Sequence, residues 1–414
     1  MKRMCFLLAG LATLAVMVAQ PVSAADWYVT TNGTGDGSSW ANAASSIQAA
    51  ISKATTANDT VWVSNGVYEA GGVTNTPGIS SYSMTNRISI TNAITVRSAN
   101  NDPAVTTIKG AWDPATNGPA AVRCVYMVTG SKLIGFTLTN GATMVTGAGT
   151  HDQVGGGVKC QSTNTVVSNC VIVGNAANTQ GGGAYRATLY NCTLIRNSPS
   201  GKRVTNGGAA QECVLYNCGV IGNTAQNGAG GLRACTAFNC TIISNAVGDS
   251  GGGALDSTLY NCLLTGNAAT NYRGGSYNSA MYNCTIVSNS TTVSGGGVYT
   301  GALYNCIVYF NTAPGGSSYN WTNVLAATNS CTMPAIGGAM NITNDPMFVD
   351  SGSGNWRLKP DSRCVNAGTN LSWVLDPADA RGKDLDGGAR VRYGIVDIGA
   401  YEAIIGRGTA IVIR

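Results

Sequence analysis

A repeat with a period of 22 residues fills the middle of the chain and constrains the fold more than any other feature. Each copy carries an Asn-Cys pair, a short apolar run and a second asparagine five residues after the cysteine, as in residues 191–197 and 283–289. The seven repeat cysteines follow one another at steps of 22, 26, 22, 22, 22 and 22 residues: Cys170, Cys192, Cys218, Cys240, Cys262, Cys284 and Cys306. A fixed period of this length predicts a solenoid, in which each repeat packs on its neighbours.

The composition of one repeat favours strands over helices. Its apolar residues do not recur at helical spacing, and short β-prone runs such as residues 259–264 lie between glycines at 251–253 and at 266. Runs of this length, bounded by glycine, are typical of strands. A leucine-rich horseshoe would need a helical segment in every repeat, and none fits here. The repeat therefore predicts an all-β parallel β-helix with about three short strands per turn and rungs of ~22 residues about 4.8 Å apart.

Equivalent positions of successive rungs stack, so each column of the repeat has one environment. The repeat cysteines and two aliphatic columns are expected to face the core, where each aliphatic side chain contributes on the order of 1.5–3 kcal/mol by burial. The aliphatic columns are Leu189, Leu215, Ala237, Leu259, Met281 and Leu303, and Leu194, Val220, Ile242, Leu264, Ile286 and Val308. The second asparagine is expected to form a ladder of amides, which both donate and accept hydrogen bonds. The ladder positions are Asn175, Asn197, Asn223, Asn245, Asn267, Asn289 and Asn311.

The two ends of the chain differ from the repeats. Residues 1–24 have basic residues, an apolar run and a small-residue site typical of a signal peptide cut near Ala24, which predicts secretion or an envelope location. Ser45 or Ser46 can cap a helix that carries apolar residues at 47, 50, 51 and 54 on one face, and such a helix would cover the open end of the coil. We expect one domain over residues 25–402: cap and irregular rungs at 25–130, regular repeats at 131–316, C-terminal rungs at 317–402, and a tail at 403–414.

Composition limits the function classes. Charged residues make up 10% of the chain, and removing the leader's two basic residues leaves 22 basic and 19 acidic ones, a net charge of +3. No basic cluster suggests nucleic-acid binding, and no span after the leader is long and apolar enough to cross a membrane. We expect a monomer.

The repeat cysteines are expected to be buried free thiols, because stacked side chains lie about a strand spacing apart and a disulfide needs closer Cβ atoms. Cys213 and Cys235 form a second stacked pair that could bridge only if the turn there bends. A column of cysteines, with one histidine (His151) in the chain, does not predict a metal site.

Motifs at both ends resemble known families. Residues 27–29, 35–40 and 59–63 are similar to the start of secreted right-handed parallel β-helix proteins of bacteria, and the Asn-Cys-Thr rungs are similar to that group and to polymorphic outer-membrane repeats. The C-terminal motifs resemble the choice-of-anchor Q module: residues 345–348, 356–358, 365–368, 384–387 and 397–402. The resemblance implies a right-handed coil and an extracellular or cell-envelope location. Polysaccharide lyases and hydrolases commonly use this fold, although a fold does not set a function.

Two outward columns could carry chemistry. Arg186, Glu212, Arg233 and Asp256 are expected to cluster across four rungs, which would supply the carboxylates of a hydrolase or the cation of a lyase. The alternative is a solvated surface with incidental ion pairs. A column of aromatic residues could hold a glycan or could be a structural stack, and includes Tyr190, Tyr216, Phe238 and Tyr260.

Two further features are candidate binding sites. The loop that makes the single 26-residue step carries Lys202 and Arg203, which could close over an acidic sugar polymer, or it could be a neutral insertion. Asp384 and Asp386 before Gly387 are similar to a calcium loop, but a third ligand and the terminal glutamate are missing, so a tight turn is favoured over a Ca²⁺ site and no cofactor is expected.

These observations predict a secreted or cell-surface protein that binds polysaccharide or cell-surface glycan, adhesion-like and non-catalytic. The alternative is a polysaccharide lyase or glycoside hydrolase of the pectate-lyase-like β-helix type. A purely structural envelope protein is the third possibility.

Overall fold

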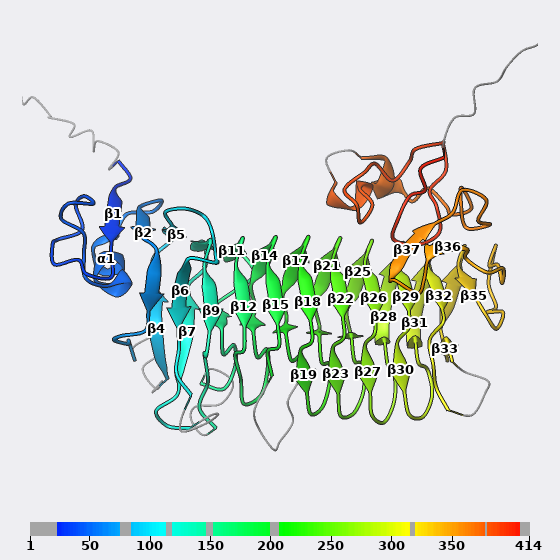
Figure 1. The fold of residues 1–414 in the computed structure, drawn as a ribbon, viewed down its shortest axis with the longest axis horizontal. Helices are drawn as coiled ribbons and strands as arrows, with labels where there is room; N and C mark the ends of the chain where they lie inside the picture. The colour runs from blue at the N-terminus through cyan, green and yellow to red at the C-terminus, as the bar shows by residue number, and fades with distance from the viewer. Residues whose placement is uncertain are drawn as a thin grey trace, which may run out of the picture.

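The computed structural model is a right-handed parallel β-helix, as the repeat predicts. It describes residues 23–74, 84–112, 118–145, 152–198, 207–314, 319–376 and 379–405. Several sequence predictions concern residues that lie almost entirely outside these ranges, and the structure does not test them. These residues are the leader, the terminal tail, His151, Lys202 and Arg203. The coil runs along the long axis of Figure 1, and a C-terminal module, residues 343–376 and 379–405, lies against one side of it.

Three walls of parallel strands form each turn of the coil. Wall 1 comprises β4 (Thr85–Ile90), β7 (Val122–Met127), β10 (Val158–Cys160), β13 (Ala184–Tyr185), β16 (Ala210–Gln211), β20 (Leu232–Arg233), β24 (Ala254–Leu255) and β33 (Trp321–Thr322). Wall 2 comprises β1 (Asp26–Val29), β2 (Thr60–Val63), β5 (Thr95–Ser98), β8 (Lys132–Ile134), β11 (Val166–Ser168), β14 (Thr188–Tyr190), β17 (Val214–Tyr216), β21 (Thr236–Phe238), β25 (Thr258–Tyr260) and β34 (Ala326–Thr328). β28 (Ser276–Tyr282) and β31 (Val298–Tyr304) run through both walls and join them into one sheet.

Wall 3 and a short fourth sheet complete the turn. Wall 3 comprises β3 (Gly66–Tyr68), β6 (Thr106–Lys109), β9 (Thr137–Thr139), β12 (Val171–Val173), β15 (Thr193–Ile195), β18 (Gly219–Ile221), β22 (Thr241–Ile243), β26 (Leu263–Thr265), β29 (Thr285–Val287), β32 (Ile307–Tyr309) and β35 (Cys331–Thr332). The fourth sheet comprises β19 (Thr224–Ala225), β23 (Ala246–Val247), β27 (Ala268–Ala269) and β30 (Ser290–Thr291).

The N-terminal cap is confirmed. Helix α1 (Ile47–Lys53) begins after Ser46, whose hydroxyl accepts a hydrogen bond from the Ala49 amide at 3.1 Å. Ile47, Ala50 and Ile51 are buried against the first rungs, so the helix covers the apolar end of the coil with the face that the sequence predicts. α1 lies at one end of the coil in Figure 1.

Left-handed residues turn the chain at each corner. Corner 1 joins walls 1 and 2 and contains Arg186, Glu212, Ala234, Asp256, Asn278 and Thr300, all with φ between 47° and 55°. Corner 2 joins walls 2 and 3 and contains Asn169, Asn191, Asn217, Asn239, Asn261, Asn283, Asn305 and Asn329, with φ between 48° and 53°. Corner 3 follows wall 3. Asparagine adopts this conformation more readily than other residues with a side chain, which explains its place in the Asn-Cys pair.

Cysteine or serine follows many of the left-handed residues, and several of these side chains point inward and accept a hydrogen bond from the backbone of the preceding rung. After corner 2 the Cys218 amide donates to the Cys240 sulfur at 3.3 Å, and the Cys306 amide donates to the Ser330 hydroxyl at 3.2 Å. After corner 1 the Cys235 amide donates to the Ser257 hydroxyl at 3.2 Å. The prediction of buried free thiols is confirmed for the seven repeat cysteines, each of which is free and buried. These thiols also act as hydrogen-bond acceptors, which the sequence reasoning missed.

The amide ladder after corner 3 is confirmed and is one rung longer than predicted. Each Nδ2 donates to the next Oδ1 at 2.9–3.0 Å from Asn175 to Asn311, and Asn311 then donates to Asn320. The seven predicted members are at most 4% exposed. The two aliphatic columns are fully buried, as expected.

The C-terminal module packs on the outer face of wall 3. It contains the antiparallel hairpin β36 (Phe348–Asp350) and β37 (Asn355–Leu358), and the 3-10 turns η2 (Ser372–Leu375) and η3 (Ala380–Gly382). Its apolar side chains form a second core with Leu263, Val287 and Ile307 of the wall. The module therefore covers one side of the coil in its C-terminal half, as Figure 1 shows.

Candidate functional site

Two of the four predicted catalytic candidates meet at corner 1. Arg186 Nε lies 2.7 Å from Glu212 Oε2, and their side chains are 46% and 34% exposed. Tyr185 donates to the other oxygen of Glu212 at 3.3 Å, and its burial beside that carboxylate raises the pKa of Tyr185 to about 12. An open hollow of about 450 Å³ adjoins this ion pair and is bounded on one side by Gln161, Ser162 and Thr163.

Arg233 and Asp256 do not join this pair. Arg233 belongs to β20, one position before the corner, and pairs in register with Gln211 and Leu255. Asp256 lies at the corner itself, where it accepts a hydrogen bond from Asn278 Nδ2 at 2.7 Å. The arrangement brings together one carboxylate and one cation, and not the two carboxylates that a glycosidase places across a cleft.

The aromatic column is a continuous stack along wall 2. Neighbouring rings from Tyr190 through Tyr216, Phe238, Tyr260 and Tyr282 to Tyr304 have centroids 4.7–5.0 Å apart and planes within 10° of each other. Each inner ring therefore covers the faces of its neighbours and presents only its edge outward. Tyr190 is the first ring of the stack and is 38% exposed.

The C-terminal module covers part of this stack. Trp373 meets Tyr260 edge to face at a centroid distance of 5.4 Å and Tyr282 at 6.3 Å. The Arg381 guanidinium lies over Tyr260, 5.4 Å from the ring centroid. The aromatic edges beyond the module are those of Tyr190, Tyr216 and Phe238, which limits the predicted glycan-binding strip to three rungs.

A polar cleft lies on the other side of corner 2 from these three rings, against wall 3. It has a volume of about 630 Å³ and separates the coil from the module. The coil supplies Asn191, Asn217 and Asn239, each next in sequence to one of the three aromatic residues. Asn217 Nδ2 donates to Asn191 Oδ1 at 3.3 Å, so the two carboxamides form an exposed ladder.

The floor and the opposite side of the cleft add further polar groups. Gly219 occupies the column that holds Thr193 and Thr241 in the adjacent rungs, which hollows the floor. Arg357 and Lys383 line the module side, and Asp386 holds Arg357 by hydrogen bonds to Nε and Nη2, at 2.7 Å from Nε. The sequence reasoning did not identify this cleft, because nothing local predicts where the module docks.

Asp384 and Asp386 lie in a tight turn. Asp384 accepts the Gly388 amide at 2.6 Å, and the Gly387 amide donates to the Asp384 carbonyl at 2.9 Å, which closes a tight turn with Gly387 at φ 82°. The tight-turn interpretation is therefore confirmed. Among the described residues, no group of three or more His, Cys, Asp or Glu side chains could hold a metal ion.

A buried lysine lies on wall 1, one rung before Tyr185. Lys159 is 4% exposed, and its ammonium lies 5.7 Å from the ring centroid of Tyr126. Burial, together with the charges of Arg123 and Arg186, lowers the pKa of Lys159 to about 7, and Asp152 acts in the opposite direction. A lysine of this kind is partly neutral near pH 7 and can accept a proton.

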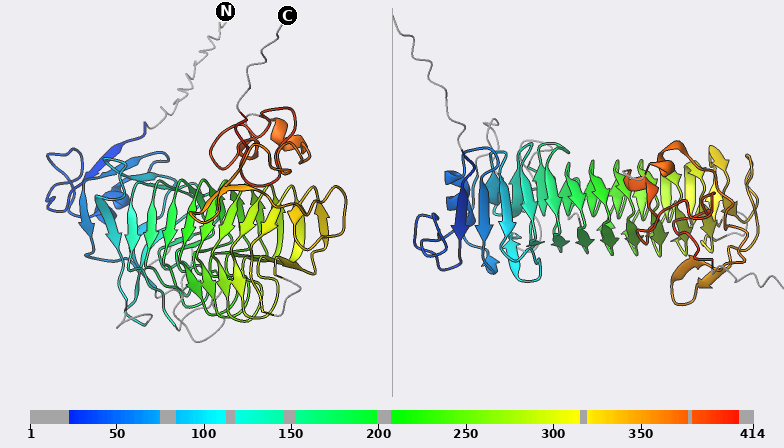
Figure 2. Two further views of the ribbon diagram at one scale, coloured as in Figure 1. Left: turned by 45° about the vertical axis from the view of Figure 1, so that its right-hand side comes forward. Right: turned by 90° about the horizontal axis from the view of Figure 1, so that it is seen from above.

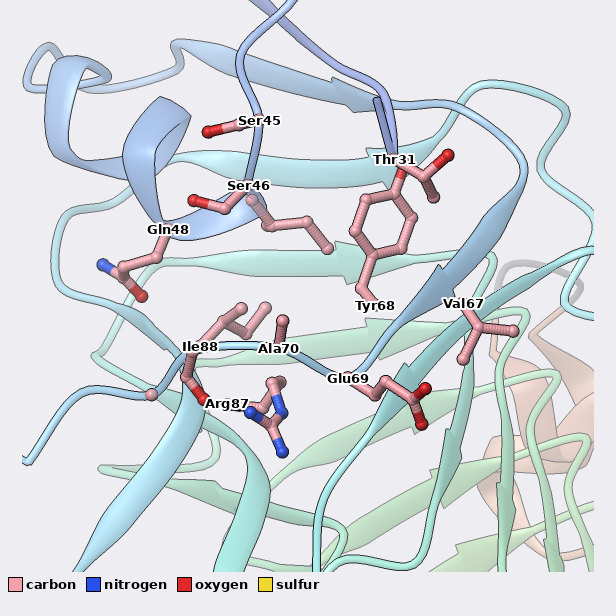
Figure 3. Close-up of a pocket in the computed structure, with 13 residues that line it drawn as sticks. Thr31, Ser45, Ser46, Gln48, Val67, Tyr68, Glu69, Ala70, Arg87 and Ile88 are labelled. Carbon is pink, nitrogen blue, oxygen red and sulfur yellow. Dashed lines mark hydrogen bonds between the residues drawn. The ribbon is translucent and has the colours of Figure 1, made fainter. Parts of the chain in front are cut away.

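A smaller cavity of about 160 Å³ lies beside the N-terminal cap. Figure 3 shows Ser46 and Gln48 at the start of α1, with Glu69 and Arg87 on the opposite side. Arg87 donates to the carbonyls of Gly71 and Lys109, and Glu69 pairs with Lys109 at 2.7 Å. These charged groups serve the cap structure, and we assign this cavity no ligand.

Comparisons with known proteins agree with the fold. No protein-family model matches the sequence, and no curated protein matches it. Among solved structures, the chain is similar to the pectate lyase Pel9A, with a TM-score of 0.57 and 14% identity over 92% of this chain and 97% of the lyase. A rhamnogalacturonan lyase gives a TM-score of 0.45 and 10% identity over 81% and 95% of the two chains. Carrot pectin methylesterase gives a TM-score of 0.36 and 14% identity over 74% of this chain and 89% of the esterase.

The similarity to Pel9A supports a pectate-lyase-like right-handed parallel β-helix fold. At 14% identity the likeness to Pel9A shows the fold alone. None of the helices in the described ranges is long and apolar enough to span a bilayer.

Proposed function

We propose that the protein binds a polysaccharide along corner 2, between the aromatic edges of wall 2 and the cleft beneath the C-terminal module. One observation carries the proposal: three successive rungs each present an aromatic edge followed by an asparagine carboxamide, at Tyr190–Asn191, Tyr216–Asn217 and Phe238–Asn239. We call this surface the binding face. It repeats at the strand spacing of ~4.8 Å, so it offers equivalent contacts to a linear polymer.

The chemistry of the binding face suits sugar hydroxyl groups. Carboxamides donate and accept hydrogen bonds, as hydroxyls do, and the ring edges add apolar surface beside them. The charges nearby are largely paired, since Asp386 holds Arg357 and Glu212 holds Arg186, which leaves Lys383 exposed on the module. A neutral or weakly acidic polysaccharide therefore fits better than a highly charged one.

Binding assays on the mature protein would test this proposal. Neutral and acidic polysaccharides would be screened by affinity electrophoresis and then titrated against a double variant, Asn191→Ala with Asn217→Ala. We expect this variant to bind at least about tenfold more weakly, since two carboxamides are lost from an otherwise unchanged face. Asn278→Ala is the matched control, because Asn278 is an exposed left-handed asparagine at corner 1. Equal binding by both variants would refute the proposed face.

Lys159 favours a second candidate function, a polysaccharide lyase. A neutral amine could take the proton from the carbon next to a uronate carboxyl group, and Arg186 could stabilise the negative charge that develops. Because Lys159 is 4% exposed, the overlying residues 152–155 would have to move to admit a substrate.

Absorbance of unsaturated products would test the lyase candidate on the same panel of polysaccharides. Activity should rise as the pH passes through about 7 and should be lost in Lys159→Met. Turnover that survives this substitution, or no turnover on any uronate polymer, would rule out this role for Lys159.

A further inference from the structure

Two cysteines differ in position from all the others that the structure describes. Eleven of the thirteen described cysteines belong to the core inside the coil. Cys331 and Cys364 instead belong to the second core, between wall 3 and the C-terminal module. Cys331 continues the outward column of Thr285 and Ile307 in β35, and Cys364 reaches it from the module.

The stacked cysteines inside the coil are poorly placed for disulfides. They occupy parallel strands or equivalent corners, so their Cβ atoms lie about 4.8 Å apart and point the same way, whereas a disulfide requires roughly 3.5–4.5 Å. Cys331 and Cys364 escape this constraint, because they face each other from separate segments. Both are fully buried, and the Cys364 thiol lies close enough to Cys331 to raise the pKa of the Cys331 thiol, which itself donates to the Asn344 carbonyl at 3.1 Å.

We propose that Cys331 and Cys364 are joined by a disulfide that fixes the C-terminal module to the outside of the coil. The oxidant is a disulfide of the folding compartment, such as oxidised glutathione or an oxidised thiol–disulfide oxidoreductase. The thiolate of one cysteine attacks that disulfide and releases one thiol, and the second cysteine then displaces the other. One protein disulfide forms, one oxidant disulfide becomes two thiols, and the two cysteine protons pass to the released thiolates.

The cross-link has a defined structural consequence. It closes a loop from residue 331 to residue 364 that contains the hairpin of β36 and β37. It holds the module at the point from which residues 365–376 and 379–387 run back along the coil towards the binding face. Both sulfur atoms are fully buried between the wall and the module, so the disulfide is protected from exchange once the module has docked.

Thiol counting tests the proposal directly. The chain from residue 25, which lacks Cys5, is refolded in a glutathione redox buffer, denatured and labelled with N-ethylmaleimide without reductant. We expect eleven labels on the thirteen cysteines, and thirteen labels after reduction. Peptide mapping without reduction should recover residues 331 and 364 in one linked pair. Thirteen labels before reduction, or a link between any other pair, would overturn the proposal.

Single substitutions sharpen this test. Cys331→Ser leaves Cys364 without its partner, so all twelve remaining cysteines should label with or without reductant. Cys306→Ser is the matched control from inside the coil, and it should give ten labels before reduction and twelve after. Dithiothreitol should lower the thermal midpoint of the wild type and leave the thermal midpoint of Cys331→Ser unchanged. If dithiothreitol changed both midpoints by the same amount, the cross-link would not hold the module.

Discussion

Removing one side chain from the middle of the amide ladder should destabilise the coil strongly. Asn245 is fully buried, and its carboxamide makes four hydrogen bonds. Nδ2 donates to Asn267 Oδ1 at 3.0 Å and to the Val220 carbonyl at 2.8 Å. Oδ1 accepts from the Asn223 amide at 3.0 Å and from Asn223 Nδ2 at 2.9 Å. Asn245→Ala deletes all four bonds and affects partners in the two adjacent rungs.

The expected cost follows from these partners. A buried hydrogen bond contributes about 1 kcal/mol net, and a buried group left without a partner costs about 1–3 kcal/mol. The Asn267 oxygen keeps its bond from the Asn245 amide, and Asn223 Nδ2 keeps its bond to the Leu194 carbonyl, each at 3.0 Å. The Asn223 amide loses its acceptor, and Asn223 Nδ2 and the Val220 carbonyl each lose one partner. Allowing for relaxation and water entry, we expect a loss of about 3–5 kcal/mol in the free energy of unfolding.

Urea unfolding followed by circular dichroism would measure this loss, with Asn217→Ala as the control. Asn217 is exposed at corner 2 and donates one side-chain hydrogen bond, at 3.3 Å. Because solenoids can unfold in segments, hydrogen exchange at the Asn223 amide provides a local readout of the lost acceptor. A loss for Asn245→Ala within about 1 kcal/mol of the control would refute this account of the ladder.

Asn245→Asp separates hydrogen bonding from shape. The substitution keeps the size of the side chain but replaces its donors with a carboxylate that faces the Val220 carbonyl and Asn267 Oδ1. Burial should raise the pKa of the introduced carboxyl above its unfolded value of ~3.9. The variant should therefore be least stable at neutral pH and regain stability as the pH falls towards 4. A stability difference from the wild type that does not change with pH would contradict this reasoning.

Substitutions at four other residues test other parts of the structure. Cys240→Ser should cost less than about 1 kcal/mol in a urea titration, because serine can still accept from the Cys218 amide, whereas Cys240→Val should cost about 1–3 kcal/mol. Burial raises the pKa of Glu402 to about 8, above its unfolded value of ~4.5. The stabilising contribution of Glu402 is therefore present below pH ~4.5 and is lost as the pH rises to 8. In thermal unfolding measured at several pH values, Glu402→Gln should reduce the dependence of the thermal midpoint on pH. Arg186→Gln or Glu212→Gln should change the unfolding free energy by less than about 1 kcal/mol, because the pair is exposed; a larger change would show that corner 1 depends on it.

The sequence predicted the repeating parts of the fold well. The period sets the stacking register, so the aliphatic columns, the ladder and the thiol column follow from position alone. Helix α1 follows from its cap and its apolar spacing, which are local signals. The left-handed turns of corner 1 were not predictable in this way, since residues as different as Arg186, Glu212 and Ala234 occupy them. The stacked walls impose that conformation against residue preference.

The candidate site was predicted only in part, because its boundary depends on contacts between distant segments. The aromatic column was visible in the sequence. The sequence did not indicate that stacking covers the ring faces, or that Trp373 lies against Tyr260. The predicted cluster across four rungs combined two neighbouring positions of the repeat and assumed that both bring their side chains to the same place. Arg233 lies one position earlier in the repeat than Arg186, and that single position places it in a strand instead of at the corner.

Corner 2 links the two uses of the Asn-Cys pair. In the C-terminal half of the coil its asparagines dock the module: Asn261 Nδ2 donates to the carbonyls of Arg381 and Lys383, and Asn305 Nδ2 donates to the Thr369 carbonyl at 2.9 Å. The preceding rungs present the same carboxamides to the cleft at Asn191 and Asn217. A column selected for left-handed turns thus supplies hydrogen-bonding groups along its whole length, and the position of the module decides which of them remain available to a ligand. Moving the module along the coil would therefore lengthen or shorten the binding face without changing any residue on it.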